Sequence, residues 1–383
     1  MDESRISPIV GSPTMRAVLL AVAYFLSAEL GHWLSLKSRD QVFATFWPPA
    51  GLLLAVLVLN RIADWPTFLF TACLANLASD VVFHEKPVPV SAGYCVANLT
   101  EACIGTWLLR RFGNSPLALT RVNDVLALAG MSALFSCAVG ATIGAAVTVA
   151  AFDGVSFWPA WWMWWVSDAV GILVAAPVVL TWVNEYEALF ADFALERVVE
   201  GVALSTGICA MAQAIFGGLL PTSLSVPIFI LPFFVWSGLR FSPAVCATVI
   251  LAVGLIGVAN TAHGRGPYIL LTDDARLQVL RSQATLSVIS LCVLALAATV
   301  AERREVERQK TQLIGELEQA VNEIKTLRGL IPLCAWCRKI RNDQGLWQRI
   351  EDYLRAHTDA RVSHGICPEC LEKQLATIPD TRV

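Results

Sequence analysis

Long apolar runs recur through the first 300 residues of this 383-residue chain, and they constrain its fold more than any other feature. Many of these runs reach the roughly 18 to 20 residues that a helix needs to cross the hydrocarbon core of a membrane. Charged residues and Pro or Gly separate one run from the next. Ten spans are predicted, at residues 15–36, 44–60, 64–83, 90–111, 124–152, 160–183, 199–219, 225–241, 243–262 and 279–301. The sequence therefore predicts an all-α polytopic membrane protein.

Charged residues divide the chain near residue 300. Residues 301–383 carry 14 Lys and Arg and 13 Asp and Glu. The whole chain is 56% hydrophobic and only 15% charged, so the charged residues are concentrated in this last part. An ordinary soluble domain has roughly 25% charged residues, so the composition argues against a soluble enzyme. The net charge of −3 and the lack of a long basic run give no electrostatic case for a nucleic-acid partner.

Composition and charge together predict five parts of the chain and its orientation in the membrane. The parts are a cytoplasmic N-terminal segment 1–14, a membrane-embedded domain 15–301, a helix 302–331, a cysteine module 332–376 and a flexible C-terminus 377–383. Lys and Arg near the span ends, counted with those beside both termini, number twelve on one side and five on the other. Cytoplasmic flanks are enriched in these residues. Both termini are therefore expected in the cytoplasm, in agreement with an even number of spans.

A heptad seam follows the last predicted span. Five apolar side chains recur at intervals of three and four residues, namely Leu313, Leu317, Ala320, Ile324 and Leu327. This spacing is typical of the a and d positions of a coiled coil. Two chains held in one membrane have a raised local concentration, which favours a parallel homodimer through this seam. The alternative is a single amphipathic helix that lies on its own tail domain.

Four cysteines near the end of the chain form two closely spaced pairs, Cys334 with Cys337 and Cys367 with Cys370. Both sulfurs of such a pair can reach one tetrahedral ion, and two pairs make a closed four-thiolate zinc site. A turn at 342–345, a short helix at 347–356 and a last helix opened by the second pair predict a treble-clef-like α+β module. Zinc would stabilise this module, whose hydrophobic core is too small to keep it folded by itself. The alternative is thiol redox chemistry.

Polar and ionisable side chains also occur inside the predicted spans, where they face a cavity, a partner or a functional site. The candidates for a ligand or polar pocket are Glu29, His32, Asn98, Glu101 and Asp168. Glu29 with His32, and Asn98 with Glu101, lie on one helical face because three residues separate each pair. Asn76 and Asp80 form a similar pair, but Asp80 is expected near the surface and in contact with water. The alternative role for all of them is interhelical hydrogen bonding, worth about 1 kcal/mol each.

Three segments resemble a known family. They are Phe46-Trp47-Pro48-Pro49-Ala50-Gly51 at the start of the second span, Asn98-Leu99-Thr100-Glu101-Ala102, and Trp164-Trp165-Val166-Ser167-Asp168-Ala169-Val170-Gly171. Together they resemble the bacterial membrane-associated sensor domain of the first class, the MASE-one family, over residues 15–300. The resemblance implies a multi-span sensory input module of the bacterial inner membrane. Residues 330–341 and 363–370 resemble a short cysteine-rich C-terminal module of bacterial sensory proteins.

No catalytic residue is expected, because the sequence contains no cyclase signature, no phosphoacceptor histidine region and no kinase ATP-binding box. We expect a non-enzymatic sensor in which the helix after the last span relays a signal to the cysteine module and so to a cytoplasmic signalling protein. Two other functions stay open. One is a transporter that uses Glu29, Glu101 and Asp168 for a cation or proton, and the other is a membrane-tethered dithiol redox protein.

Overall fold

The structure is a computed structural model. It describes residues 12–38, 41–43, 45–113, 117–191, 195–221, 227–328, 332–342, 344–358 and 361–377. The chain divides into two compact units, Met1–Val306 and Glu307–Val383. Each unit is described by itself below.

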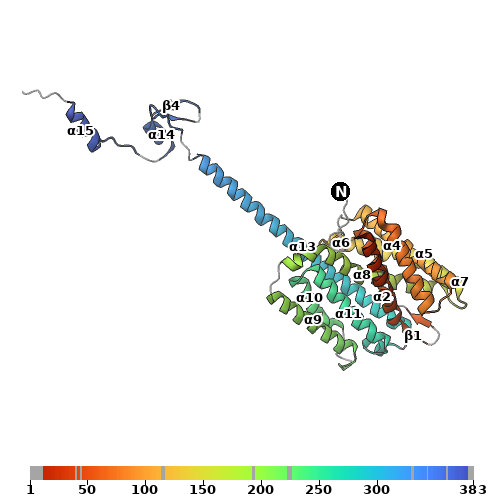
Figure 1. The fold of residues 1–383 in the computed structure, drawn as a ribbon. Coiled ribbons are helices and arrows are strands. Elements are labelled where there is room, and N and C mark those ends of the chain that lie inside the picture. The colour runs from red at the N-terminus through yellow and green to blue at the C-terminus, as the bar shows by residue number, and fades with distance from the viewer. Residues whose placement is uncertain are drawn as a thin grey trace, which may run out of the picture. The chain divides into compact units, whose positions relative to one another are not determined.

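All ten predicted apolar segments fold as helices in the first unit (Figure 1). The helices are α2 (Pro13–Trp33), α3 (Pro48–Leu59), α4 (Trp65–Leu77) continuing into the π-helix η2 (Ala78–Phe83), α5 (Val88–Phe112), α6 (Val122–Ala127) continuing through the π-helix η3 (Leu128–Ser136) into α7 (Cys137–Ala151), α8 (Phe157–Ala191), α9 (Leu195–Phe216), η4 (Pro227–Ile230) leading into α10 (Leu231–Arg240), α11 (Pro243–Ala262) and α13 (Ala275–Arg328). Four short elements were not predicted. They are the 3-10 turn η1 (Ile62–Asp64), the helix α12 (Pro267–Leu271) and two strands that form an antiparallel pair, β1 (Leu36–Ser38) and β2 (Gln41–Phe43), with Leu36 opposite Phe43. Segments of three to five residues carry too few positions for a periodic pattern.

Proline and serine fix several helix starts. Pro48 and Pro49 occupy the first turn of α3, and Pro243 opens α11. Proline costs little there because the first N–H groups of a helix have no partner within it. At α2 the backbone N–H of Met15 donates to the hydroxyl of Ser12 over 3.3 Å, which satisfies one of those groups. The predicted role of the two prolines as a helix start is confirmed.

Seven helices in the described ranges are long and apolar enough to cross a membrane. Three of the ten predicted spans do not qualify. Helix α3 has 12 residues and α10 has 10, so α3 is about 18 Å long against a hydrocarbon core of about 30 Å. Helix α5 is long enough, but Ser91, Asn98 and Glu101 lower its hydropathy. The predicted count of ten spans is therefore not confirmed.

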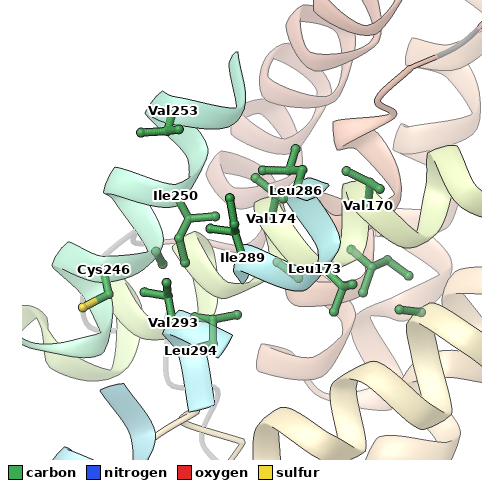
Figure 2. Close-up of a cluster of buried hydrophobic side chains, with 14 of the residues drawn as sticks. Val170, Leu173, Val174, Cys246, Ile250, Val253, Leu286, Ile289, Val293 and Leu294 are labelled. Carbon is green, nitrogen blue, oxygen red and sulfur yellow. The ribbon is translucent and has the colours of Figure 1, made fainter. Parts of the chain in front are cut away.

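The main hydrophobic core extends through most helices of the first unit, and one part of it lies where α8, α11 and α13 meet (Figure 2). Val170 and Val174 of α8 pack in one cluster with Ile250 of α11 and with Ile289 of α13. A second cluster joins α2, α3, α4 and α5. It contains Leu20, Tyr24, Leu53, Leu57, Phe68, Ala72, Ala75 and Ala102. The short helix α3 contributes to both clusters, which explains why a 12-residue segment is apolar throughout.

Large apolar side chains also cover the outside of the first unit. Leu26 on α2 is 59% exposed, Phe70 on α4 is 66% exposed and Val288 on α13 is 60% exposed. Exposed apolar side chains are unfavourable in water but meet acyl chains in a bilayer. These surfaces agree with the seven apolar helices, and they indicate a multi-pass membrane protein.

The second unit holds the end of α13, the strands β3 (Ile340–Arg341) and β4 (Trp347–Gln348), and the helices α14 (Ile350–His357) and α15 (Pro368–Ala376). The strands form an antiparallel hairpin in the predicted turn region, where Leu346 N–H donates to the Asn342 side-chain oxygen over 2.8 Å. The short helix begins at Ile350 rather than at residue 347, because Trp347 and Gln348 belong to β4. In the described part of this unit, Ile340 is the only buried side chain.

The predicted seam lies on the far half of α13. Leu313 and Leu317 are 66% and 64% exposed, and Ala320 is also exposed. Ile324 and Leu327 belong to the helix, but their side chains fall outside those described. A row of exposed leucines on a continuous helix is available for pairing, and the coiled coil stays a prediction.

Candidate functional site

The segment Phe46–Gly51 packs its backbone directly against α8. The Trp47 N–H donates to the Ser167 carbonyl oxygen over 3.3 Å. A methyl group on Gly51 would lie 2.7 Å from the backbone nitrogen of Ala176, and one on Gly171 would collide with the carbonyl oxygen of Trp47. Glycine at both positions permits this close approach. Two of the three segments that carry the family resemblance are thus in contact.

Residues 45–47, called here the 45–47 segment, also contact α2 and α13. The Thr45 hydroxyl donates to the Leu34 carbonyl oxygen at the end of α2 over 2.6 Å. The Trp47 ring meets the His32 ring edge-on, with centroids 5.2 Å apart. From α13, the buried Gln283 amide donates to the Thr45 carbonyl oxygen over 3.1 Å. The 45–47 segment therefore joins α2, α8 and α13.

A first polar cluster surrounds Asp80 in η2, and we call it the Asp80 cluster. Asp80 is 2% exposed. Its carboxylate accepts hydrogen bonds from Lys86 Nζ at 2.6 Å, from Asn76 Nδ2 at 2.9 Å and from Ser91 Oγ at 3.2 Å. His32 Nε2 lies 3.4 Å from the same carboxylate. The buried negative charge is therefore paired with a cation and held by several donors, as a charge inside a membrane protein requires.

The Asp80 cluster extends inward along α4 and α5. The Tyr24 hydroxyl donates to Asn76 Oδ1 over 3.2 Å, and Asn98 Nδ2 donates to the same oxygen over 3.1 Å. Tyr24 is fully enclosed in the bundle, and Asn98 is 9% exposed. The cluster thus reaches from the end of η2 into the middle of the helices.

The same cluster opens outward through two histidines. The rings of His32 and His84 lie with centroids 3.8 Å apart. His84 Nε2 is 3.2 Å from Glu29 Oε2, and the Ser79 hydroxyl donates to Glu29 Oε1 over 2.6 Å. The side chains of His84 and Glu29 are about one third exposed, at 31% and 30%. Glu29 and His84 therefore form the accessible end of the Asp80 cluster.

A second polar cluster is a pair of carboxyl groups, Glu101 on α5 and Asp168 on α8. Both residues are 2% exposed, and their carboxyl groups are in hydrogen-bond contact. Glu101 also contacts the thiol of Cys137. A methyl group on Gly140 would lie 2.6 Å from Glu101 Oε2, so glycine makes room for the carboxyl group. In the described ranges, no donor group gives a hydrogen bond to Glu101 Oε2 or to Asp168 Oδ2.

The five residues predicted for one polar pocket therefore separate into two groups. Glu29, His32 and Asn98 belong to the Asp80 cluster, whereas Glu101 and Asp168 form the carboxyl pair. The expectation that Asp80 is wet is wrong, because η2 turns it inward, where donors from three elements surround it.

Sequence reasoning missed several members of these clusters, among them Tyr24, His84 and Lys86. Lys86 entered only the count of positive charges at span ends. Its position six residues after an intramembrane aspartate was a usable signal. Nothing in the sequence marked Tyr24 or His84.

The first cysteine pair of the tail lies in a tight turn. Cys334 N–H donates to the Lys339 carbonyl oxygen over 2.8 Å, and Arg338 N–H donates back to the Cys334 carbonyl oxygen over 3.0 Å. Arg338 has a φ of 59°, which this reversal requires. The backbone N–H groups of Cys337 and Trp336 point at the Cys334 sulfur and lower the pKa of its thiol. The turn therefore favours the thiolate that metal binding or redox chemistry needs.

The second cysteine pair opens α15, as predicted, with Cys367 as the residue that caps the helix. The N–H of Cys370 hydrogen-bonds the Cys367 sulfur and lowers the pKa of that thiol. Within the described ranges, no three His, Cys, Asp or Glu side chains are grouped so that they could hold a metal ion. The convergence of all four cysteines on one zinc ion stays a prediction.

Comparison with known proteins assigns the larger part of the chain to a family. The MASE1 family model matches residues 16–304. No curated protein and no solved structure matches the chain. The matched region includes the 45–47 segment, the Asp80 cluster, the carboxyl pair and the apolar half of α13. Since the match covers well over half of the sequence and seven helices of the described ranges are apolar enough to span a membrane, this multi-pass membrane protein belongs to the MASE1 family.

Proposed function

We propose that this protein is a non-enzymatic sensor of the bacterial inner membrane, which passes a stimulus along α13 to its cysteine module and so to a cytoplasmic signalling protein. The observation that carries the proposal is the position of the 45–47 segment. It contacts His32 in the Asp80 cluster, Ser167 beside the carboxyl pair, and Gln283 of α13. A stimulus that changes the packing of either polar cluster thus has a route to α13, provided that it binds two states of the bundle with different affinities.

Two anchor points on α13 support a relay across the membrane. Gln283 bonds to the 45–47 segment, and Arg304 donates to the Leu239 carbonyl oxygen at the end of α10 over 2.7 Å. Twenty-one residues separate them, about 32 Å along a helix, which is close to the thickness of a hydrocarbon core. Helix α2 ends near the first anchor point, where Thr45 bonds to Leu34. The start of α2 and the exit of α13 then lie on one side, which supports the proposal that both termini are cytoplasmic.

The relay as proposed acts through a parallel homodimer with Leu313, Leu317 and Ala320 in its seam. A photoreactive amino acid at Leu317 is expected to crosslink two full-length chains in membranes. The same group at Glu318, on the adjacent face of the helix, is the matched control and should crosslink less. Equal crosslinking at both positions, or none at Leu317, would rule out transmission through this seam.

For the tail we propose a structural zinc ion held by Cys334, Cys337, Cys367 and Cys370. The support is the residue spacing, the N–H groups that point at the Cys334 and Cys367 sulfurs, and a unit with Ile340 as its only buried side chain among those described. About one zinc per purified full-length chain is expected. Cys367→Ser should lose it, whereas Cys292→Ser, which removes a single exposed cysteine of α13, should keep it. A chain without metal and with a reducible Cys334–Cys337 disulfide would instead support the redox function.

A second candidate function is proton-coupled transport, and the observation that favours it is the enclosed pair of Glu101 and Asp168. Reconstitution of the protein in liposomes separates the two functions. Proton flux that depends on Glu101 would replace the sensor proposal. Liposomes with wild-type protein that conduct no more protons than empty ones would leave the sensor as the better account.

A further inference from the structure

The carboxyl pair has no cation beside it in the described ranges, whereas Asp80 and Glu200 each pair with one. Among the ion pairs of the first unit, His32 and Lys86 pair with Asp80, His84 with Glu29, and Arg240 with Glu200. Within the described ranges, neither Glu101 nor Asp168 takes part in an ion pair. Two negative charges in hydrogen-bond contact, enclosed and without a counter-ion, would repel each other strongly and would also lose their hydration.

The surroundings of the pair offer little other compensation. The titratable groups that face it are the Cys137 thiol from α7 and the Tyr24 phenol from α2. Helix α3, which packs between α5 and α8, has no titratable residue. One oxygen of each carboxyl group, Glu101 Oε2 and Asp168 Oδ2, is buried without a hydrogen-bond partner. Burial in this environment costs a neutral carboxylic acid much less free energy than it costs a carboxylate.

From this geometry we infer that Glu101 and Asp168 form a proton-binding site, in which a protonated carboxyl group of one donates a hydrogen bond to the other. Two carboxyl groups that share one site hold a proton between them for the same reason in other proteins. We assign a proton rather than a metal ion, because in the described ranges no three His, Cys, Asp or Glu side chains are arranged so that they could hold a metal ion. Binding forms one O–H bond with a proton taken from water, and release returns that proton to water.

Polar side chains also provide a route to the pair from the accessible end of the Asp80 cluster. Glu29 and His84 are partly exposed, and His32, Asp80 and Asn76 follow inward. Tyr24 is bonded to Asn76, and its hydroxyl group can both donate and accept hydrogen bonds. The inferred route runs through this hydroxyl group and through water that links it to the carboxyl pair. This inference does not depend on the proposed sensory function, since a transporter would use the same site.

Infrared spectroscopy of the full-length protein in lipid nanodiscs tests the site directly. A protonated carboxylic acid has a C=O stretch that a carboxylate lacks, and its intensity can be followed as pH rises. We expect a band that shifts in frequency and titrates at a different pH in Glu101→Gln and in Asp168→Asn, because each variant leaves one buried acid without its partner. The double variant Glu101→Gln/Asp168→Asn should lose the band, whereas the matched control Glu200→Gln should leave it unchanged. A band that is absent from the wild type, or that survives in the double variant, would overturn the inference.

Two further variants keep the test valid if an amide variant fails to fold. Gly140→Ala keeps both carboxyl groups but places a methyl group against Glu101 Oε2, so the band should titrate at a different pH from that of the wild type. Tyr24→Phe removes the hydroxyl group of the route, and the band should respond several-fold more slowly to a pH jump. A band that moves with sodium concentration at constant pH would assign the site to a metal cation and overturn the proton assignment.

Discussion

Replacing Lys86 by methionine should destabilise the bundle, because it leaves the buried charge of Asp80 without a cation. Lys86 Nζ lies 2.6 Å from Asp80 Oδ1, and the two side chains are 28% and 3% exposed. Methionine keeps most of the aliphatic stem and removes the charge. The double variant Lys86→Met/Asp80→Asn removes both charges, and the amide oxygen can still accept hydrogen bonds from Asn76 and Ser91.

The size of the effect follows from what remains around Asp80. Loss of one partner from a fully buried ion pair costs about 3 to 5 kcal/mol. Asp80 keeps its bonds from Asn76 and Ser91 at 2.9 and 3.2 Å, and the partial exposure of Lys86 screens some of the interaction. We therefore expect a loss of about 2 to 3 kcal/mol for the single variant. The double variant should lose about 1 kcal/mol, a difference that measures the coupling between the two residues.

Denaturant unfolding of the protein in micelles, followed by the fluorescence of its 13 tryptophans, provides the free energies. Arg240→Met is the matched control. This variant removes the ion pair between Arg240 and Glu200. The Arg240 side chain is 56% exposed, and a surface ion pair contributes about 0.5 kcal/mol to the free energy of unfolding. If the single and double variants at Lys86 and Asp80 lost the same free energy, the idea that Asp80 is a charge requiring compensation would be refuted.

Four other substitutions test the packing, the relay and the exposed part of α13. Gly51→Ala should cost about 1 to 3 kcal/mol, since its methyl group has no room against α8. A methyl group at Gly130 would have nothing within 4 Å, so Gly130→Ala should raise the free energy of unfolding by up to about 1 kcal/mol through helix propensity. Equal unfolding free energies for the Gly51 and Gly130 variants would contradict the packing argument. Gln283→Met should lose about 1 kcal/mol with its bond to Thr45 and should change crosslinking at Leu317, whereas unchanged crosslinking would exclude this contact from the relay. Gly315→Ala, in the exposed part of α13, should stabilise that part by about 1 kcal/mol, seen as slower amide hydrogen exchange over residues 310–321.

The helices were predictable because apolar runs between charges and prolines mark them in any membrane protein. The number of spans was not, and α3 shows why. Its 12 residues are apolar because it packs into both core clusters, and a residue buried by other helices has the same composition as one buried by lipid. Composition alone therefore overstates the number of helices that cross a bilayer.

The polar residues were found from the sequence, but their partners were not. Asn98 and Glu101 are three residues apart, a spacing that suggested one common pocket. Three residues rotate a helix by about 300°, so the two side chains are about 60° apart and meet different neighbours. Asn98 bonds to Asn76 of α4, and Glu101 contacts Asp168 of α8. The π-helical turn that buries Asp80 depends on tertiary contacts, and no local pattern indicates it.

The two polar clusters differ in how readily each can adopt a second state. The charge of Asp80 is held by Lys86 and by hydrogen bonds from Asn76 and Ser91, so any change there breaks several interactions at once. The carboxyl pair is held by the inferred hydrogen bond between its own two members, and loss of its proton would replace that attractive contact between α5 and α8 by repulsion. Asp168 follows Ser167, whose carbonyl oxygen accepts the Trp47 N–H, and Gln283 of α13 bonds two residues before Trp47, at Thr45. A movement of α8 away from α5 therefore acts on α13 through a single intervening segment. Of the two clusters, the carboxyl pair is the one whose change of state requires the least rearrangement elsewhere.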